Sequence, residues 1–178
     1  MNYGFHRVIE PQGAVPQAAL RLYNTTTIIH PAEILIRVSL LNLDSTGMAT
    51  LRKRGIDIGE QVLGIVEQRG KLHNPVTSSG GVLVGEIKAI GEGVNPDFEL
   101  AVSEIIIPVV STSTLPLHLD EVGQVSADQV EVSGHAILFD GMGYYGLPED
   151  FSLPLAMSAN VSKCGRWPVH PHHWCRQV

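Results

Sequence analysis

The sequence predicts a mainly β fold with peripheral helices, arranged as a partly open β-barrel. About seven or eight short segments along the 178 residues alternate apolar and polar side chains, the period of a strand, and one longer segment has clear helical spacing. No Gly-x-Gly-x-x-Gly turn joins a strand to a helix. The nearest approach, Gly141-Met142-Gly143, runs into Tyr144–Pro148, which cannot begin a helix. We therefore expect no Rossmann nucleotide-binding domain in this chain.

Composition and charge indicate one soluble globular domain. Hydrophobic residues make up 44% of the chain and charged residues 17%, which is ordinary for a folded domain of this length. The net charge of -6 comes without a basic stripe, so nucleic acid and anionic membranes are poor candidates for partners. No apolar run approaches the roughly 20 residues that cross a bilayer. Because only two cysteines occur and the N-terminus lacks the order of a signal peptide, we expect a cytoplasmic protein without a disulfide framework.

Strands and one helical turn are predicted for the first third of the chain. Val8-Ile9 and Ala18–Tyr23 are short extended segments, separated by prolines and a glycine that interrupt any helix. Glu33–Leu43 alternates without a breaker and is the strongest predicted strand. Thr46–Leu51 is predicted to form a helical turn directly after it.

A helix is predicted over Asp57–Arg69, where apolar residues recur at helical spacing. Asp57 can cap its first turn, and Gly70 follows its last residue at the position typical of a helix end. The internal Gly64 lowers the helix propensity without removing the pattern.

The second half of the chain begins with a strand bounded by glycines. Val82–Ile90 alternates like a half-buried strand, and Gly91-Glu92-Gly93 predicts a tight turn after it. Ser103–Val110 is another predicted strand, in which Pro108 indicates an edge position or a bulge. Further segments are short strands or turns at Leu115–Val122 and Gln129–Val132, a strand at His135–Phe139 and a helix at Ser152–Ser158.

The composition changes after about residue 158. From Asn160 onward both tryptophans, both cysteines and three of the eight histidines crowd together, and no helical or strand period remains. Three interpretations stay open: a frameshifted or truncated gene, a disordered native tail, and a metal site built from Cys164, His170, His172, His173 and Cys175. Because the spacing of those five residues matches no known ligand pattern, we expect a domain over residues 1–158 and an atypical tail over 159–178.

Several segments resemble one enzyme family. The strand Ile34–Asp44 and the glycine-bounded hairpin resemble the GroES-like N-terminal domain of medium-chain dehydrogenases. More specific blocks are similar to the L-erythro-3,5-diaminohexanoate dehydrogenases of lysine fermentation, and they are His6–Pro11, Pro16–Ala19, Leu43–Ser45, Arg69–Thr77 and Gly134–Phe139. The resemblance covers about residues 4–158 and is most specific at Gly70–Thr77.

This resemblance implies an NAD-dependent oxidative deamination of a 3,5-diamino acid to a 5-amino-3-oxo acid. Where zinc-dependent relatives carry a Gly-His-Glu signature, this chain has Gly80-Gly81-Val82, so we expect no catalytic metal. The family's Rossmann domain would begin near Ser152–Ser158, so the chain resembles a truncated enzyme, and we expect neither NAD binding nor activity from it alone. A small diamino acid is the expected partner, and a homo-oligomer of the full-length enzyme stays open.

The chemistry that this resemblance implies selects candidate site residues. Hydride removal from an amine-bearing carbon needs a neutral amine, so some group must accept a proton. His73 is the candidate acid–base residue, against the alternative of an ordinary loop histidine. Asp44 could pair with a substrate ammonium, or could simply cap the turn that follows. Substrate-binding residues are predicted at the strand end and in the polar loop: Asn42, Ser45, Asn74, Thr77, Ser78 and Ser79.

Two other functions stay open on the sequence alone. One is a different zinc-free medium-chain reductase, of the quinone or enoyl type, which would have less use for the polar block Lys71–Ser79. The other is a non-catalytic GroES-like binding module, which the missing nucleotide-binding motif makes conceivable.

Overall fold

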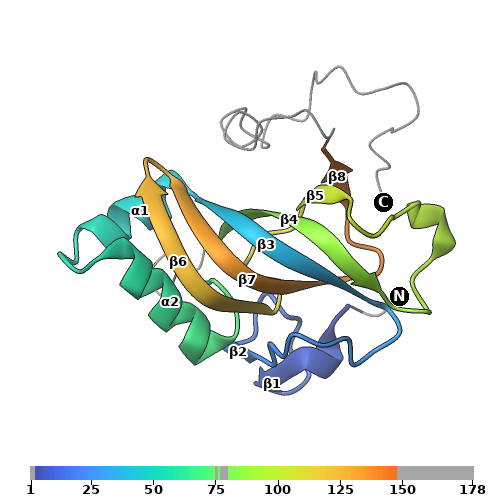
Figure 1. Ribbon diagram of the computed structural model, residues 1–178. Helices are drawn as coiled ribbons and strands as arrows, with labels where there is room; N and C mark the ends of the chain where they lie inside the picture. The colour runs from blue at the N-terminus through green and yellow to red at the C-terminus, as the bar shows by residue number, and fades with distance from the viewer. Residues whose placement is uncertain (1–2, 75, 77–79, 148–178) are drawn as a thin grey trace. The chain divides into compact units, whose positions relative to one another are not determined.

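The computed structural model describes residues 3–74, 76 and 80–147. Within this part lie a six-stranded antiparallel sheet in the order β6-β7-β3-β4-β5-β8, a separate β1-β2 pair and two α-helices (Figure 1). The prediction of a mainly β fold with peripheral helices is therefore confirmed, and the described strands form an open sheet with β6 and β8 at its edges. The elements are η1 (Phe5–Arg7), β1 (Val8–Glu10), β2 (Arg21–Leu22), β3 (Glu33–Leu43), α1 (Ser45–Arg52), α2 (Ile58–Arg69), β4 (Gly81–Ile90), η2 (Pro96–Phe98), β5 (Ile105–Pro108), β6 (Leu117–Ser126), β7 (Gln129–Phe139) and β8 (Tyr144–Gly146).

Strand β3 lies at the centre of the sheet, with β4 on one side and β7 on the other. Its first half alternates as expected, and Ile34, Ile36 and Val38 pack into the core. The register to both neighbours shifts after Val38: β3 has one extra residue opposite β4, and β7 has one extra residue opposite β3. The apolar alternation then resumes with Leu41 and Leu43 in the same core. This bulge lets an eleven-residue strand keep a continuous apolar face despite the change of register.

The helices begin and end at the capping residues that the sequence predicts. The Asp44 side chain caps α1, and the Asp57 side chain caps α2 by accepting from the amide of Glu60 at 3.0 Å. Gly70 ends α2 with φ +66°, and a Cβ there would lie 2.0 Å from the carbonyl oxygen of Leu22. Helix α2 packs against β6, and both helices contribute side chains to the core, namely Met48, Leu51, Val62 and Val66.

Strand β7 corrects the prediction of two separate segments around Ser133-Gly134. Gln129–Phe139 is one eleven-residue strand, and the glycine lies inside it opposite Leu119. A Cβ on Gly134 would lie 2.2 Å from the carbonyl oxygen of His118, so the glycine permits close approach of β6 and does not end the strand.

The β5 region also differs from the expectation of an edge position or a bulge. Strand β5 is shorter than predicted and lies between β4 and β8, a strand that the sequence pattern did not predict. Its ladder with β4 ends at Ile106, so Pro108 pairs with Tyr144 of β8 and removes no donor from the β4 ladder. The predicted helix Ser152–Ser158 and the tail over residues 159–178 lie outside the described residues.

A buried ion pair fixes the N-terminal segment to the start of β3. Arg7 and Glu33 are both fully buried, with Nε–Oε1 at 2.6 Å and Nη2–Oε2 at 2.7 Å. Arg7 also donates to three backbone carbonyls, and Glu33 accepts from the Ile29 amide at 2.8 Å. Burial raises the pKa of Glu33, but hydrogen bonds from Arg7, His6 and Ile29 and the charge of Arg7 outweigh it and lower that pKa to about 2. Both charges are therefore paired and hydrogen-bonded, as a buried pair requires.

Candidate functional site

Asp44 lies where the end of β3 meets the start of α1. Its Oδ1 accepts a hydrogen bond from the backbone amide of Gly47 at 2.7 Å, so the capping role is present in the structure. Its Oδ2 is buried and has no hydrogen-bond partner among the described residues. A buried carboxylate oxygen without a donor is costly, and such groups often mark a binding function. One oxygen of this carboxylate therefore caps the helix, and the other is an acceptor that no described donor uses.

The segment after α2 carries the most specific block of the sequence. Lys71 is fully buried, and its Nζ donates to the carbonyl oxygens of Pro16 at 2.7 Å and Gln17 at 3.0 Å. Burial, and secondly the charge of Arg69, lower the pKa of Lys71 to about 8. These bonds tie Lys71 to residues 16 and 17, so it anchors the segment after α2 to the N-terminal part of the chain.

Asn74 and His73, which follow Lys71 closely in the sequence, each contact one of the two helices. Asn74 is buried, accepts from the amide of Val76 through Oδ1 at 2.9 Å, and donates through Nδ2 to the carbonyl oxygen of Gly47 at 3.5 Å. His73 is half-buried, with Nδ1 3.5 Å from Nη1 of Arg69. The structure thus brings Asn74 to the α1 turn that Asp44 caps.

The other predicted binding residues divide into three groups. Ser45 is the exposed first residue of α1, next to Asp44. Asn42 is half-buried and, by strand alternation, faces away from the side of β3 that carries Leu43. Their roles stay predictions, as do those of three residues outside the described part of the chain: Thr77, Ser78 and Ser79.

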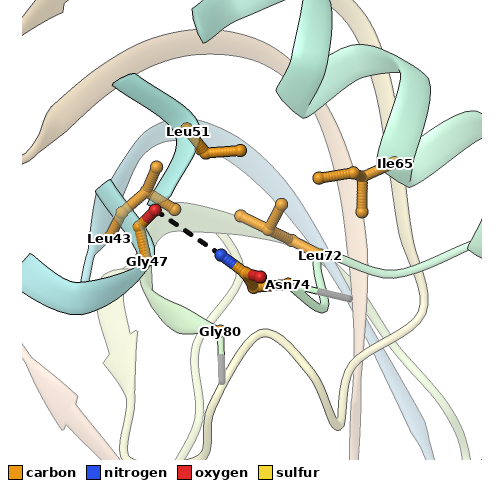
Figure 2. Close-up of a pocket in the computed structure, with 7 residues that line it drawn as sticks. All are labelled: Leu43, Gly47, Leu51, Ile65, Leu72, Asn74 and Gly80. Atoms are coloured by element: carbon orange, nitrogen blue, oxygen red, sulfur yellow. Dashed lines mark hydrogen bonds between the residues drawn. The ribbon is translucent and has the colours of Figure 1, made fainter. Parts of the chain in front are cut away.

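A small apolar pocket lies between α1, α2 and the segment after α2. Figure 2 shows aliphatic side chains converging on it and the amide of Asn74 closing one side by its bond to Gly47. Its volume is about 10 Å³, roughly the space of one water-sized group. It is lined by Leu43, Gly47, Leu51, Ile65, Leu72, Asn74 and Gly80.

Gly47 connects this pocket to the Asp44 carboxylate. Gly47 lines the pocket, and a Cβ built on it would lie 3.2 Å from Oδ2 and 3.3 Å from Oδ1 of Asp44. The carboxylate, the amide of Asn74 and the pocket therefore all meet at one residue of α1. This arrangement suits a ligand that carries a small apolar group beside a cation.

A hydroxyl-rich turn at residues 111–114 holds together the segment after α2 and the start of β4. This role was not predicted from the sequence. Thr112 is fully buried; its Oγ1 accepts from the Gly81 amide at 2.9 Å and donates to the carbonyl oxygen of Leu72 at 3.3 Å. Gly80 packs so closely on this turn that a Cβ would lie 2.6 Å from the hydroxyls of Ser111 and Thr112. The run Ser-Thr-Ser-Thr at 111–114 was the signal available in the sequence.

Features that a metal site or a membrane-spanning protein would need are missing from the described residues. Among residues 3–147, apart from the undescribed positions, no three histidine, cysteine, aspartate or glutamate side chains could hold a metal together. Within the same residues no helix is long and apolar enough to cross a membrane. The cysteines and histidines of the tail lie outside that range.

A family model and two curated relatives that match this chain carry the same enzyme name. Residues 6–148 match the family model of the L-erythro-3,5-diaminohexanoate dehydrogenase N-terminal domain. Over 164 residues the chain is 44% identical to the L-erythro-3,5-diaminohexanoate dehydrogenase of Acetoanaerobium sticklandii, which covers 89% of this chain and 47% of that relative. The enzyme of the same name from Fusobacterium nucleatum is 40% identical with the same coverage. The chain thus spans about half the length of these curated relatives.

Proposed function

Because this chain belongs to the L-erythro-3,5-diaminohexanoate dehydrogenase family, whose N-terminal domain it carries, we propose that it supplies the substrate-binding part of such an enzyme. The full enzyme would oxidise the amine-bearing C3 of the diamino acid and release ammonia, which gives a 5-amino-3-oxo acid. The observation that carries this proposal is the 44% identity over 164 residues. The family match and both relatives favour this function over a quinone or enoyl reductase and over a non-catalytic module.

The substrate dictates what the site has to do. At neutral pH it carries two ammonium groups and one carboxylate, and hydride can leave C3 only after the C3 amine has lost its proton. We assign the retained ammonium to Asp44, whose buried Oδ2 lacks a donor. A charged N–H donor would satisfy that oxygen with a strong hydrogen bond.

We assign the proton transfer to His73. An imidazole can accept and return a proton near neutral pH, and His73 directly precedes Asn74, which reaches the α1 turn beside Asp44. Asn42, Ser45, Thr77, Ser78 and Ser79 complete the proposed substrate-binding set, with Asn74 as its buried member.

The proposed cofactor of the full enzyme is NAD. The strand pairs described in this chain are antiparallel, and its described residues offer no glycine-rich turn between a strand and a helix for a dinucleotide, so they do not fit this group. We therefore assign this chain substrate binding and proton transfer alone. We further propose a GroES-like domain and a cytoplasmic location, which the open antiparallel sheet and the low cysteine content support, and a homo-oligomeric full enzyme.

Two substitutions in an enzyme that carries this domain test the residue assignments. His73→Gln should lower kcat roughly 10²-fold while KM changes little, because it removes a proton acceptor. Asp44→Asn should raise KM for the diamino acid about tenfold or more, since asparagine caps a helix equally well but cannot pair with an ammonium.

Matched controls separate these effects from loss of structure. His118→Gln changes a half-buried histidine on β6, and Asp57→Asn changes the equivalent cap of α2. Both controls should leave NADH formation unchanged. Normal kcat and pH profile in His73→Gln would return His73 to an ordinary loop role, and an unchanged KM in Asp44→Asn would leave Asp44 as a cap. No turnover of the diamino acid by the unaltered enzyme would contradict the proposed function itself.

A further inference from the structure

We propose that the pocket between α1 and α2 binds the terminal methyl group of the diamino acid, while Asp44 pairs with the ammonium on the neighbouring carbon. This assignment rests on the proposed function and goes beyond it, because it fixes which end of the substrate enters the domain. It predicts a specificity for the methyl group that the charged groups alone would not give.

The pocket has the character of a methyl site. Its walls are the aliphatic side chains of Leu43, Leu51, Ile65 and Leu72, which come from β3, both helices and the following segment (Figure 2). Its volume of about 10 Å³ admits one group of the size of water or methyl. A carboxylate or ammonium placed against these walls would lose its hydration without gaining a partner, which disfavours charged groups.

The polar neighbours of the pocket complete a match to one end of the substrate. In 3,5-diaminohexanoate the C6 methyl and the C5 ammonium share one carbon, whereas the carboxylate lies at the far end of the chain. At the pocket, Gly47 touches both the apolar cavity and the Asp44 carboxylate, whose Oδ2 lacks a donor. A methyl and an ammonium on one carbon can therefore reach the cavity and the carboxylate together.

This placement has a consequence for the reacting carbon. C3 lies two carbons from the anchored C5, so it stands outside the pocket on the side of the substrate carboxylate. The C5 end is held by burial and charge, and the C3 amine remains accessible for proton removal and oxidation. The placement thereby explains how an enzyme could distinguish two amines that carry the same charge.

Two ligands test the methyl contact on the purified chain. L-erythro-3,5-diaminohexanoate and 3,5-diaminopentanoate differ by that methyl and keep both ammonium groups and the carboxylate. Titrations followed by NMR should show roughly 10- to 200-fold weaker binding of the pentanoate, the usual discrimination of a pocket against one missing carbon. Amide shifts should centre on residues 43–51 and 70–74.

A pair of variants in α2 tests the pocket wall. Ile65→Ala removes part of the wall, so it should reduce the preference for hexanoate over pentanoate and improve relative binding of 3,5-diaminoheptanoate, which has an ethyl in place of the methyl. Ile58→Ala is the matched control, because Ile58 is also a half-buried isoleucine of α2 and does not line the pocket. In this control the relative affinities for hexanoate, pentanoate and heptanoate should equal those of the unaltered chain.

A second pair tests the ammonium contact. Gly47→Ala places a Cβ within 3.3 Å of both Asp44 oxygens, so it should weaken pentanoate, which has no methyl, as well as hexanoate. Alanine favours a helix over glycine, so loss of folding is not expected. Gly64→Ala is the control, since a Cβ on that helical glycine meets nothing within 4 Å.

The outcomes separate this inference from the function on which it rests. Equal binding of hexanoate and pentanoate, or the same ligand ratios in Ile65→Ala as in Ile58→Ala, overturns the methyl assignment and leaves the proposed function standing. Equal binding by Gly47→Ala and Gly64→Ala overturns the Asp44–ammonium contact. Absence of binding of both compounds to the chain, at millimolar concentration, overturns the inference and the proposed substrate-binding role together.

Discussion

Lys71 is a lysine without exposed surface, held by the carbonyl oxygens of Pro16 and Gln17. Burial and the nearby Arg69 lower its pKa from 10.5 to about 8, whereas the unfolded chain keeps the ordinary value. Between about pH 8 and 10.5 the unfolded state therefore binds more protons, so the contribution of Lys71 to the free energy of unfolding rises with pH. At neutral pH its charged form is a cost that the two carbonyls offset in part.

We predict that Lys71→Met removes this pH dependence. Urea unfolding at several values between pH 7 and pH 10 should give a free energy that rises with pH on the order of 1–3 kcal/mol more in the unaltered chain than in the variant. The other lysines and the tyrosines titrate in both proteins, so their contributions to the pH dependence cancel in the difference between the two. Parallel pH profiles would mean that Lys71 keeps an ordinary pKa in the folded chain.

Glu33 titrates in the opposite sense. Its folded pKa of about 2 lies below the ordinary value of 4.5, so the stabilisation from its contacts is complete above about pH 4.5 and is lost as the pH falls toward 2. Glu33→Gln leaves the buried Arg7 charge without its partner and should lower the free energy of unfolding at pH 7 by about 3–5 kcal/mol. Glu86→Gln, which alters an exposed pair with Arg37, should lower the free energy of unfolding far less, because a surface ion pair is screened by solvent. Similar losses in the two variants would contradict the importance of the buried pair.

At the scale of elements, local sequence patterns predict most of the helices and strands. They fail where contacts with distant parts of the chain determine the bounds of an element. The bounds of β3 agree with the sequence prediction because no glycine or proline interrupts this apolar segment, and α2 agrees because Asp57 and Gly70 supply both of its ends. The two segments predicted on either side of Gly134 form one strand, because the role of this glycine depends on how closely β6 approaches, which local pattern does not contain. Likewise β8 is a three-residue strand defined by its pairing with β5.

The turn at Thr112 shows how one element holds another. Its hydroxyl joins the carbonyl of Leu72, before the polar loop, to the amide of Gly81, at the start of β4. We predict that Thr112→Val lowers stability by about 1–3 kcal/mol and speeds hydrogen exchange at Gly81, because two buried groups lose their partner. Thr112→Ser keeps the hydroxyl and should restore slow exchange. If Val and Ser gave equal exchange rates, the hydroxyl would not be the link.

The candidate site was predictable to a similar, partial extent. The sequence indicates Asp44 because a carboxylate follows a strong strand, and the structure shows both its cap and its unsatisfied oxygen. Asn74 was selected from a block of sequence, and its buried position beside Gly47 became visible only in the fold. The apolar pocket combines β3, α1, α2 and the next segment, so no local window of sequence could indicate it.

At the scale of the whole molecule, the match over residues 6–148 falls on a mainly antiparallel β domain. The relatives are about twice as long, and the chain spans 47% of each. A dinucleotide is normally bound at the carboxyl ends of parallel strands, by a glycine-rich turn and a helix N-terminus. The described ladders are antiparallel, and the helices α1 and α2 begin at aspartate caps, whose negative charge opposes a phosphate.

We therefore predict that the 178-residue chain binds the diamino acid but not NAD. Titration calorimetry should show no heat with NAD at concentrations up to about 1 mM, whereas the diamino acid should give a saturable signal that Gly47→Ala weakens. A longer enzyme that carries this domain should bind both, since its remaining half would supply the nucleotide site. Micromolar binding of NAD to the chain would contradict this division, because it would require a cofactor site among residues where neither the sequence motif nor the described ladders provide one.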